Sequence, residues 1–268
     1  MTALDGGLDR LAIEKHLGTS FASVNYLTHI DRKRKFAYVE TPKVACTSIK
    51  KFLMDQVVDG CFHLENKNQV HNREISPLTQ LSELDMASAI EVWSSKFRRF
   101  SFVRNPFSRL LSGFLDKLIT NEYERQRHLP MMGFEPGYVP TLLEFLERLA
   151  QKSDSDRDIH FRTQSELLML AHVDYDFIGR FERFDRDFLW LQQAFYGIDH
   201  PNDSYENFGK HHASDANSKI EQYFGDREAQ LVHDIYGTDF ANFDYPIDIK
   251  KASEQQLPVR VGMLGKWL

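Results

Sequence analysis

The stretch Arg104-Asn-Pro-Phe-Ser-Arg-Leu-Leu-Ser112 marks the point where a predicted strand ends and a predicted helix begins. The strand is expected over residues 100–104, where β-prone apolar residues form a short run. The helix is expected over residues 106–120, because apolar residues recur there at three- and four-residue spacing. Asn105 suits the N-cap position and Pro106 suits the first helical position. The junction therefore predicts a strand followed at once by a helix.

The same junction has the features of an anion-binding site. The first amide groups of a helix have no intrahelical partners and lie at the positive end of its dipole, so they suit a phosphate or sulfate. Arg104 lies at the strand end, where its guanidinium can hold such an anion through two parallel donors. Ser108 and Ser112 are four residues apart and share one helix face. An ordinary strand-to-helix turn with a surface arginine explains this segment alone equally well.

A second junction of the same kind favours the anion site. Glu40-Thr-Pro-Lys-Val-Ala-Cys-Thr-Ser48 again contains a strand end, a tight loop and a helix start. Lys43 can reach an anion as a mobile point charge, and Thr47 and Ser48 offer hydroxyl groups near helix-terminal amides. The loop lacks the glycines of a Walker A sequence, so an ordinary nucleoside triphosphatase is a poor match. Two such junctions predict one ligand with two separate anionic groups.

Strands and helices alternate along the whole chain. Strands are expected at 36–40, 100–104 and 173–179, and helices at 47–57, 82–95, 106–120, 141–151, 161–171, 184–196 and 218–236. This order predicts an α/β fold with a mainly parallel central sheet that helices cover on both faces. We expect a single domain over residues 1–268. Residues 1–30 are predicted to be a lead-in with a short helical patch, and the irregular segment 121–140 is predicted to be a lid or an acceptor-side insertion.

Composition narrows the class of protein further. The formal net charge of −6 argues against a general nucleic-acid binder, which usually carries a basic excess. Only Cys46 and Cys61 are present, so a disulfide-stapled secreted scaffold is not expected. No apolar run approaches the roughly 18 residues that span a bilayer, and no signal-peptide pattern opens the sequence. These features predict a soluble, cytoplasmic protein without a membrane span.

The two junctions resemble the cofactor-binding motifs of the sulfotransferases that use 3′-phosphoadenosine 5′-phosphosulfate (PAPS). The resemblance implies a P-loop-like sheet, with PAPS as co-substrate and 3′-phosphoadenosine 5′-phosphate (PAP) as product. It assigns the 5′-phosphosulfate to one loop and the 3′-phosphate to Arg104 and Ser112. The residues of that first loop are Lys43, Val44, Ala45, Cys46, Thr47 and Ser48.

Three later segments resemble the carbohydrate sulfotransferase branch, which includes the chondroitin enzymes. They are Asp158-Ile-His-Phe-Arg-Thr-Gln164, Tyr175-Asp-Phe-Ile-Gly-Arg-Phe-Glu182, and the pattern of Asp239, Phe240, Phe243 and Tyr245. The resemblance thus covers roughly residues 36–245. We expect the chain to differ from animal members in having no membrane anchor, and it does not contain the additional cysteines of lumenal enzymes.

Sulfuryl transfer requires a base that takes the proton of the acceptor and a cation that stabilises the departing phosphate. Lys43 is expected to supply the cation. His71, between the two cofactor motifs, and His160, in the third motif, are the two candidates for the base, because an imidazole titrates near neutral pH. No metal is expected to be required, since the histidines show no convincing ligand spacing.

Several other polar residues are expected to have lesser roles. Lys210, in a polar loop near the C-terminus, is a candidate contact of the 3′-phosphate. Glu182 and Asp158 are expected to pair with nearby Arg180 and Arg162. Arg109 and Lys117 are expected to face solvent or the acceptor channel.

The sequence therefore predicts an enzyme that transfers a sulfuryl group from PAPS to a hydroxyl of a saccharide or glycosylated metabolite. Three alternatives remain at this point. They are a sulfotransferase acting on a small non-sugar hydroxyl or amine, a P-loop kinase, and a non-catalytic nucleotide-binding protein.

Overall fold

A four-stranded sheet forms the centre of the molecule. The computed structural model describes residues 7–198, 205, 216–252 and 254. Its strands are β1 (Thr28–Asp31), β2 (Phe36–Val39), β3 (Arg98–Val103) and β4 (Phe177–Arg180), and they lie side by side in that order. β2, β3 and β4 are parallel, whereas β1 is antiparallel to β2. The prediction of a mainly parallel sheet is confirmed.

Strand β1 was not predicted, because most of it lies in the segment 1–30 that we expected to be a lead-in. Its sequence Thr-His-Ile-Asp contains a single aliphatic residue, so it has no apolar alternation to signal a strand. All four residues are nevertheless buried. Pairing with β2, from Thr28 opposite Val39 to Asp31 opposite Phe36, is what places them there.

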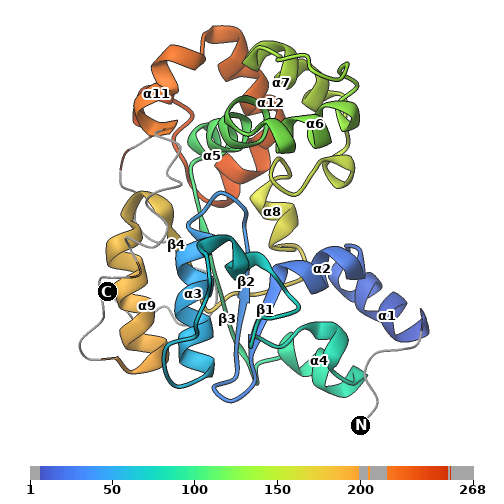
Figure 1. Ribbon diagram of the computed structural model, residues 1–268, viewed down its shortest axis with the longest axis vertical. Coiled ribbons are helices and arrows are strands. Elements are labelled where there is room, and N and C mark those ends of the chain that lie inside the picture. The colour runs from blue at the N-terminus through green and yellow to red at the C-terminus, as the bar shows by residue number, and fades with distance from the viewer. Residues whose placement is uncertain (1–6, 199–204, 206–215, 253, 255–268) are drawn as a thin grey trace.

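The two faces of the sheet bury different side chains. Tyr38, Phe100 and Phe102 point to one face, where they pack with α3 (Cys46–Val57) and α9 (Phe184–Tyr196). On the other face, alternate residues such as Ala37 and Val39 belong to a second apolar cluster. That cluster includes side chains of α1 (Gly7–Leu17), α2 (Phe21–Leu27), α4 (Met86–Val92) and α5 (Pro106–Phe114). Helices cover both faces, as predicted (Figure 1).

A second group of helices lies beyond the carboxyl ends of the parallel strands (Figure 1). It contains α5, a π-helical turn at Leu115–Thr120, α6 (Glu122–Met131), α7 (Leu142–Ala150), α8 (Gln164–Leu167), α11 (Ala216–Tyr223) and α12 (Asp226–Asn242). Short 3₁₀ turns occur at Lys67–His71, Leu81–Glu83, Asp154–Asp156, Phe181–Arg183 and Ile249–Lys251. In the part of the chain that the structure describes, no helix is both long and apolar enough to cross a bilayer.

Several predictions about these elements need correction. Of the helix expected at 161–171, only α8, Gln164–Leu167, is helical. The helix expected at 106–120 is α-helical only to residue 114 and then widens into the π-helical turn. The helix expected at 218–236 is two helices, because Gly225 starts α12 in an extended conformation. The segment 121–140 is less irregular than expected, since α6 occupies half of it with Pro130 in its last turn.

Gly179 in β4 allows the sheet to pack closely. A Cβ atom built at this position would lie 2.3 Å from the ring of Phe102 on the neighbouring strand. The absence of a side chain therefore lets the aromatic ring cover the strand beside it.

Candidate functional site

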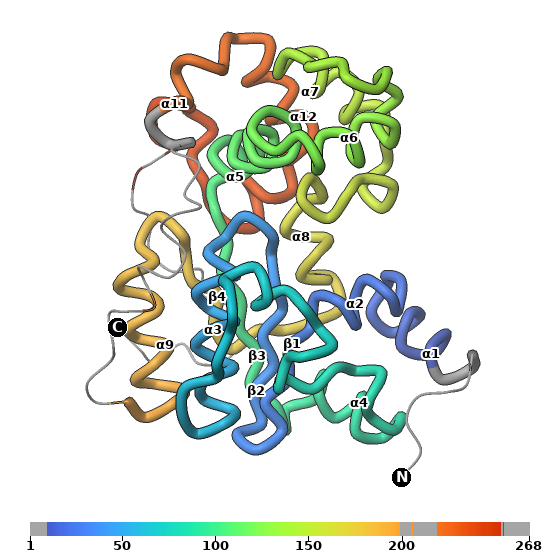
Figure 2. The backbone as a smooth tube through the Cα atoms, in the orientation of Figure 1, coloured from blue at the N-terminus to red at the C-terminus, as the bar shows by residue number. Residues whose placement is uncertain are grey.

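The two predicted anion loops lie next to each other. They follow β2 and β3, which are adjacent and parallel, so their carboxyl ends meet at one edge of the sheet. Figure 2 shows the chain passing from β3 directly into α5, and from β2 over a loop into α3. Arg104 Nη1 donates a hydrogen bond to the carbonyl oxygen of Lys43 at 3.3 Å. Arg109 Nε donates to the carbonyl oxygen of Pro42 at 3.0 Å. The two loops are thus joined by direct hydrogen bonds.

The loop after β2 has an unusual backbone. Lys43 and Ala45 adopt positive φ angles of 72° and 51°, although neither is a glycine. Such left-handed conformations cost about 1–2 kcal/mol per residue and often occur at functional sites. Ala45 is the N-cap of α3, and no side-chain hydrogen bond caps the helix there. The first amides of α3 are therefore available to an anion.

Lys43 lies within a small group of opposite charges. Its Nζ is 3.0 Å from Asp116 Oδ2, and Lys117 Nζ is 3.4 Å from the same oxygen. Burial lowers the pKa of Lys43, and Asp116 opposes this shift. Although burial acts the other way, Lys43 and Lys117 hold the pKa of Asp116 below its usual range. Asp116 thus balances the charge of Lys43, and an anionic ligand would compete with it.

Arg104, in the loop after β3, is held firmly by its neighbours. Its side chain is buried, Nε donates to Ser108 Oγ at 2.9 Å, and the guanidinium lies 4.2 Å from the centre of the Phe181 ring. Burial lowers its pKa to about 10, so it stays charged at neutral pH. Ser112, one turn after Ser108, is also buried on this helix.

The start of α5 is built as predicted. Asn105 is the N-cap, and its Oδ1 accepts a hydrogen bond from Phe107 N at 3.0 Å. Pro106 occupies the first helical position. The junction after β3 therefore has the expected local structure, with Arg104 immediately before the cap.

Residues of the three downstream segments hold the Arg104 loop in place through hydrogen bonds. Gln164 bonds to both backbone groups of Arg104, each at 2.8 Å. Asp239 in turn accepts hydrogen bonds from the amides of Gln164 and Ser165. Glu182 accepts from Asn105 N at 2.7 Å. Residues that are far apart in the sequence thus fix one loop.

Three expectations about polar residues near this loop were wrong. Glu182 pairs with Asn105 N and the Tyr245 hydroxyl rather than with Arg180. Asp158 bonds to His160 rather than to the side chain of Arg162. The third concerns Arg109, which was expected to face solvent or the acceptor channel but is buried and donates to three carbonyl groups. Lys117, for which the same was expected, is largely buried in ion pairs with Asp116 and Glu124, and shares Asp116 with Lys43. The contacts of Glu182 and Arg109 join elements that are 50 or more residues apart in the sequence.

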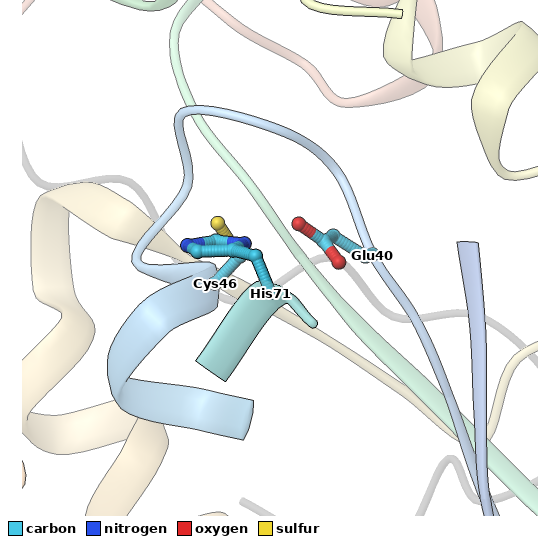
Figure 3. A group of neighbouring side chains, drawn as sticks. All are labelled: Glu40, Cys46 and His71. Atoms are coloured by element: carbon cyan, nitrogen blue, oxygen red, sulfur yellow. The ribbon is translucent and has the colours of Figure 1, made fainter. Parts of the chain in front are cut away.

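His71 lies against the first turns of α3, and Figure 3 shows it beside Cys46 and Glu40. Lys50 Nζ is 2.7 Å from His71 Nδ1, and Thr47 Oγ1 is 3.2 Å from His71 Nε2. A lysine ammonium only donates, so we assign the ring proton of His71 to Nε2. Burial, together with Lys50, lowers the pKa of His71 to about 4. Both ring nitrogens are therefore engaged with protein groups.

Glu40 connects this histidine to the sheet. Its Oε2 accepts from Lys50 Nζ and lies near His29 Nε2, each at 2.9 Å. This role of Glu40 was not predicted from the sequence, although Glu40 comes directly after β2. Burial raises the pKa of the Cys46 thiol to about 11, so it is protonated and shows no sign of nucleophilic activation.

His160 differs from His71 in which ring nitrogen carries the proton. Its Nδ1 is 2.5 Å from Asp158 Oδ1, and its backbone amide donates to the same oxygen. A carboxylate only accepts, so Nδ1 carries the ring proton and Nε2 keeps its lone pair. Burial lowers the pKa of His160, while Asp158 opposes this change. The charges of Lys43 and Lys117 also lower it, which means that His160 lies within electrostatic range of the phosphate loop.

His128 of α6 completes this second group. Its Nε2 is 3.2 Å from Glu124 Oε2, and its Nδ1 is 3.9 Å from Asp158 Oδ2. The structure thus brings part of the segment 121–140 next to His160. Lys210, the remaining predicted contact, lies outside the described residues.

The comparisons with known proteins agree with this geometry. A family model described as "Sulfotransferase family" matches residues 27–246, and the chain belongs to this family. Carbohydrate sulfotransferase 9 of Homo sapiens is 28% identical over 258 residues, which cover 87% of this chain and 56% of that protein. Carbohydrate sulfotransferase 10 of Xenopus laevis is 29% identical over 241 residues, covering 81% and 66% respectively. The chain therefore spans between half and two thirds of these relatives. No solved structure matches the chain.

Proposed function

We propose that this protein is a PAPS-dependent sulfotransferase that transfers a sulfuryl group to a hydroxyl of a saccharide. The observation that carries the proposal is the joining of two cation-bearing strand-to-helix loops through Arg104 and the Lys43 carbonyl. One ligand with two anionic groups fits such a pair. The family match and the carbohydrate sulfotransferase names of the relatives support the same class of reaction.

The chemistry of the two loops fits PAPS, and the loop after β2 would bind the phosphosulfate in the manner of a P-loop. The loop Lys43–Ser48 offers the ammonium of Lys43, the hydroxyls of Thr47 and Ser48, and the uncapped amides of α3. These groups would hold the 5′-phosphosulfate. Arg104 and Ser112, with Lys210, would hold the 3′-phosphate. When bound, PAPS supplies the activated sulfuryl group.

His160 suits the role of base better than His71. Its Nε2 is unprotonated and can take the proton of an acceptor hydroxyl, while Asp158 keeps Nδ1 protonated and stabilises the imidazolium that forms. The proton thus moves from the acceptor oxygen to His160 Nε2. His71 instead carries its proton on Nε2, and Lys50 occupies Nδ1. We assign His71 to the positioning of Thr47.

Lys43 stabilises negative charge in this scheme. Its ammonium lies at the loop that would hold the phosphosulfate, and it can stabilise charge on the phosphate oxygen left behind. Asp116 orients the ammonium through the 3.0 Å ion pair. Part of the segment 121–140 borders the acceptor side, since His128 lies beside Asp158 and His160. This position supports its assignment as a lid or acceptor-side insertion.

A transfer assay tests the proposal. The purified protein is incubated with radiolabelled PAPS and a panel of saccharides, and the products are separated and identified by mass. We expect label on a saccharide hydroxyl and release of PAP. Label on small non-sugar acceptors only would contradict the saccharide assignment, and no transfer to any acceptor would contradict the enzyme assignment.

A further inference from the structure

We propose that His128, Asp158 and His160 form a binding site for a divalent transition-metal ion such as Zn²⁺, and that the bound ion inhibits sulfuryl transfer. The three residues come from α6 and from the loop that precedes α8. One ligand atom from each lies within 4.8 Å of the others. Two imidazoles and one carboxylate form a donor set that zinc accepts readily.

The geometry of the three side chains suits one shared ion. Asp158 lies between the two rings, with one oxygen 2.5 Å from His160 Nδ1 and the other 3.9 Å from His128 Nδ1. The ring centres are 6.0 Å apart and the ring planes are perpendicular, at 89°. Tetrahedral zinc with bonds of about 2.0–2.2 Å places its ligand atoms roughly 3.3–3.6 Å apart. Small side-chain rotations therefore suffice to enclose an ion.

The surroundings orient the ligands as in known metal sites. Glu124 Oε2 lies 3.2 Å from His128 Nε2, so Nδ1 of the same ring is left facing Asp158. A carboxylate behind a histidine ligand fixes its tautomer and raises its basicity. His128 is only 2% exposed, whereas Asp158 and His160 are 17% and 18% exposed. Three protein ligands with an accessible side leave a fourth position for water or an acceptor group.

A second cluster, made of Glu40, Cys46 and His71, has a comparable spacing but a different electrostatic setting (Figure 3). Lys50 Nζ lies 2.9 Å from Glu40 Oε2 and 2.7 Å from His71 Nδ1. A lysine ammonium therefore already occupies the ligand atoms that a metal ion would need. Lys117 lies near the cluster at His128, with its Nζ 3.4 Å from Glu124 Oε2, but among the described residues no lysine bonds directly to His128, Asp158 or His160. We therefore place the ion there.

Inhibition follows from the tautomer of His160 and rests on the proposed function. An ion bound at Nδ1 would displace the ring proton to Nε2, and an ion bound at Nε2 would block that atom directly. In both cases Nε2 of His160 cannot take the proton of the acceptor hydroxyl. Metal binding itself does not depend on sulfotransferase activity, so the two ideas can be tested separately.

Metal binding is measured first, on the metal-free full chain with Co²⁺ as a spectroscopic probe and with Zn²⁺ in competition. We expect a tetrahedral Co²⁺ absorption spectrum that Zn²⁺ abolishes. His128→Gln and Asp158→Asn should each weaken Zn²⁺ binding at least about tenfold, in line with losing a metal ligand. The matched controls His233→Gln and His71→Gln should leave it unchanged. Loss of binding in His71→Gln, or retention in His128→Gln, would overturn the site.

X-ray absorption on the native zinc-loaded protein gives a test that needs no variant. The proposed site predicts nitrogen and oxygen ligands only, whereas the Glu40, Cys46 and His71 cluster predicts one sulfur ligand. A sulfur ligand, or no bound zinc, would contradict the proposal.

The transfer assay then tests inhibition. Zn²⁺ should suppress transfer by the native protein. The transfer rate of His128→Gln, compared with its own rate without zinc, should not change when Zn²⁺ is added. Zinc that binds at the site without inhibiting would overturn the inhibitory part of the proposal. If the protein transfers no sulfate under any condition, the proposed function fails, while the spectroscopic result still decides the metal site.

Discussion

Arg104 Nη1 donates a hydrogen bond to the backbone carbonyl of Lys43, at a distance of 3.3 Å between the two atoms. These residues are 61 positions apart and belong to different strand-to-helix junctions. The contact fixes the spacing between the two loops, and thereby the spacing between two anionic groups that one ligand can present. The proposed cofactor site depends on this spacing.

Replacing Arg104 tests whether the loop after β3 holds the 3′-phosphate. Arg104→Lys keeps the positive charge but loses the planar guanidinium that bonds to Ser108 and to the Lys43 carbonyl. We expect PAP affinity to fall about 10- to 100-fold, the effect of losing a charge-assisted hydrogen bond of about 1.5–3 kcal/mol. The measurement is calorimetric titration with PAP. The exposed Arg98→Lys on β3 is the matched control and should bind like the native protein.

The effect of substitution on turnover distinguishes the two candidate bases, His71 and His160. His160→Gln should lower kcat by roughly 10²- to 10⁴-fold, because it removes the proposed base. His71→Gln should lower kcat far less, since that ring only positions Thr47. PAP affinity should stay near the native value in His160→Gln. Equal losses of kcat in both variants, or a larger loss in His71→Gln, would show that the base is assigned to the wrong residue.

The buried His71 makes stability depend on pH. Its folded pKa is about 4, below the ordinary value of 6.5. The unfolded chain therefore binds a proton at this site that the folded chain does not. The stabilisation is complete above pH 6.5 and is lost as the pH falls through 4.

Urea unfolding at pH 7 and at pH 4.5 measures this effect. When the pH is lowered from 7 to 4.5, the free energy of unfolding of the native protein should decrease. In His71→Gln the decrease should be smaller by about 2–3 kcal/mol. The comparison removes the contribution of His29, which is also buried with a low pKa and is present in both proteins. Identical pH dependence in the two proteins would mean that His71 is not held neutral by its surroundings.

The close packing at Gly179 gives a prediction about the fold. Gly179→Ala would place a methyl group 2.3 Å from the ring of Phe102, so it should lower the free energy of unfolding by about 1–3 kcal/mol. Gly237→Ala is the control, because a Cβ there meets no described heavy atom within 4 Å. We expect that variant to be as stable as the native protein or slightly more so. Comparable destabilisation by both changes would argue against the strand packing described above.

Local sequence patterns predicted the parts of the fold that depend on neighbouring residues. Asn105 and Pro106 start α5 as expected, and α9 has the predicted limits of 184 and 196. Strand β1 could not be predicted in this way, because its burial comes from pairing with β2 rather than from its own composition. The π-helical turn after α5 likewise has no signal in the apolar spacing, which continues through it.

The candidate site was predicted only in part, because contacts between side chains leave no signal in local sequence patterns. The motifs located Lys43 and Arg104, but the choice between His71 and His160 depends on Lys50 and Asp158, whose hydrogen bonds set the two tautomers. Asp116, one turn after Ser112, was also missed, although it forms the ion pair with Lys43. The cytoplasmic location and the absence of a metal requirement stay predictions.

The most direct test of the account is calorimetric titration of the native protein with PAP, the product that carries both phosphate groups. Binding at the two joined loops predicts saturable binding of PAP, weakened in both Lys43→Gln and Arg104→Lys. It also predicts much weaker binding of adenosine 5′-phosphate, which lacks the 3′-phosphate that Arg104 would hold. No saturable binding of PAP, or equal affinity for PAP and adenosine 5′-phosphate, would contradict it.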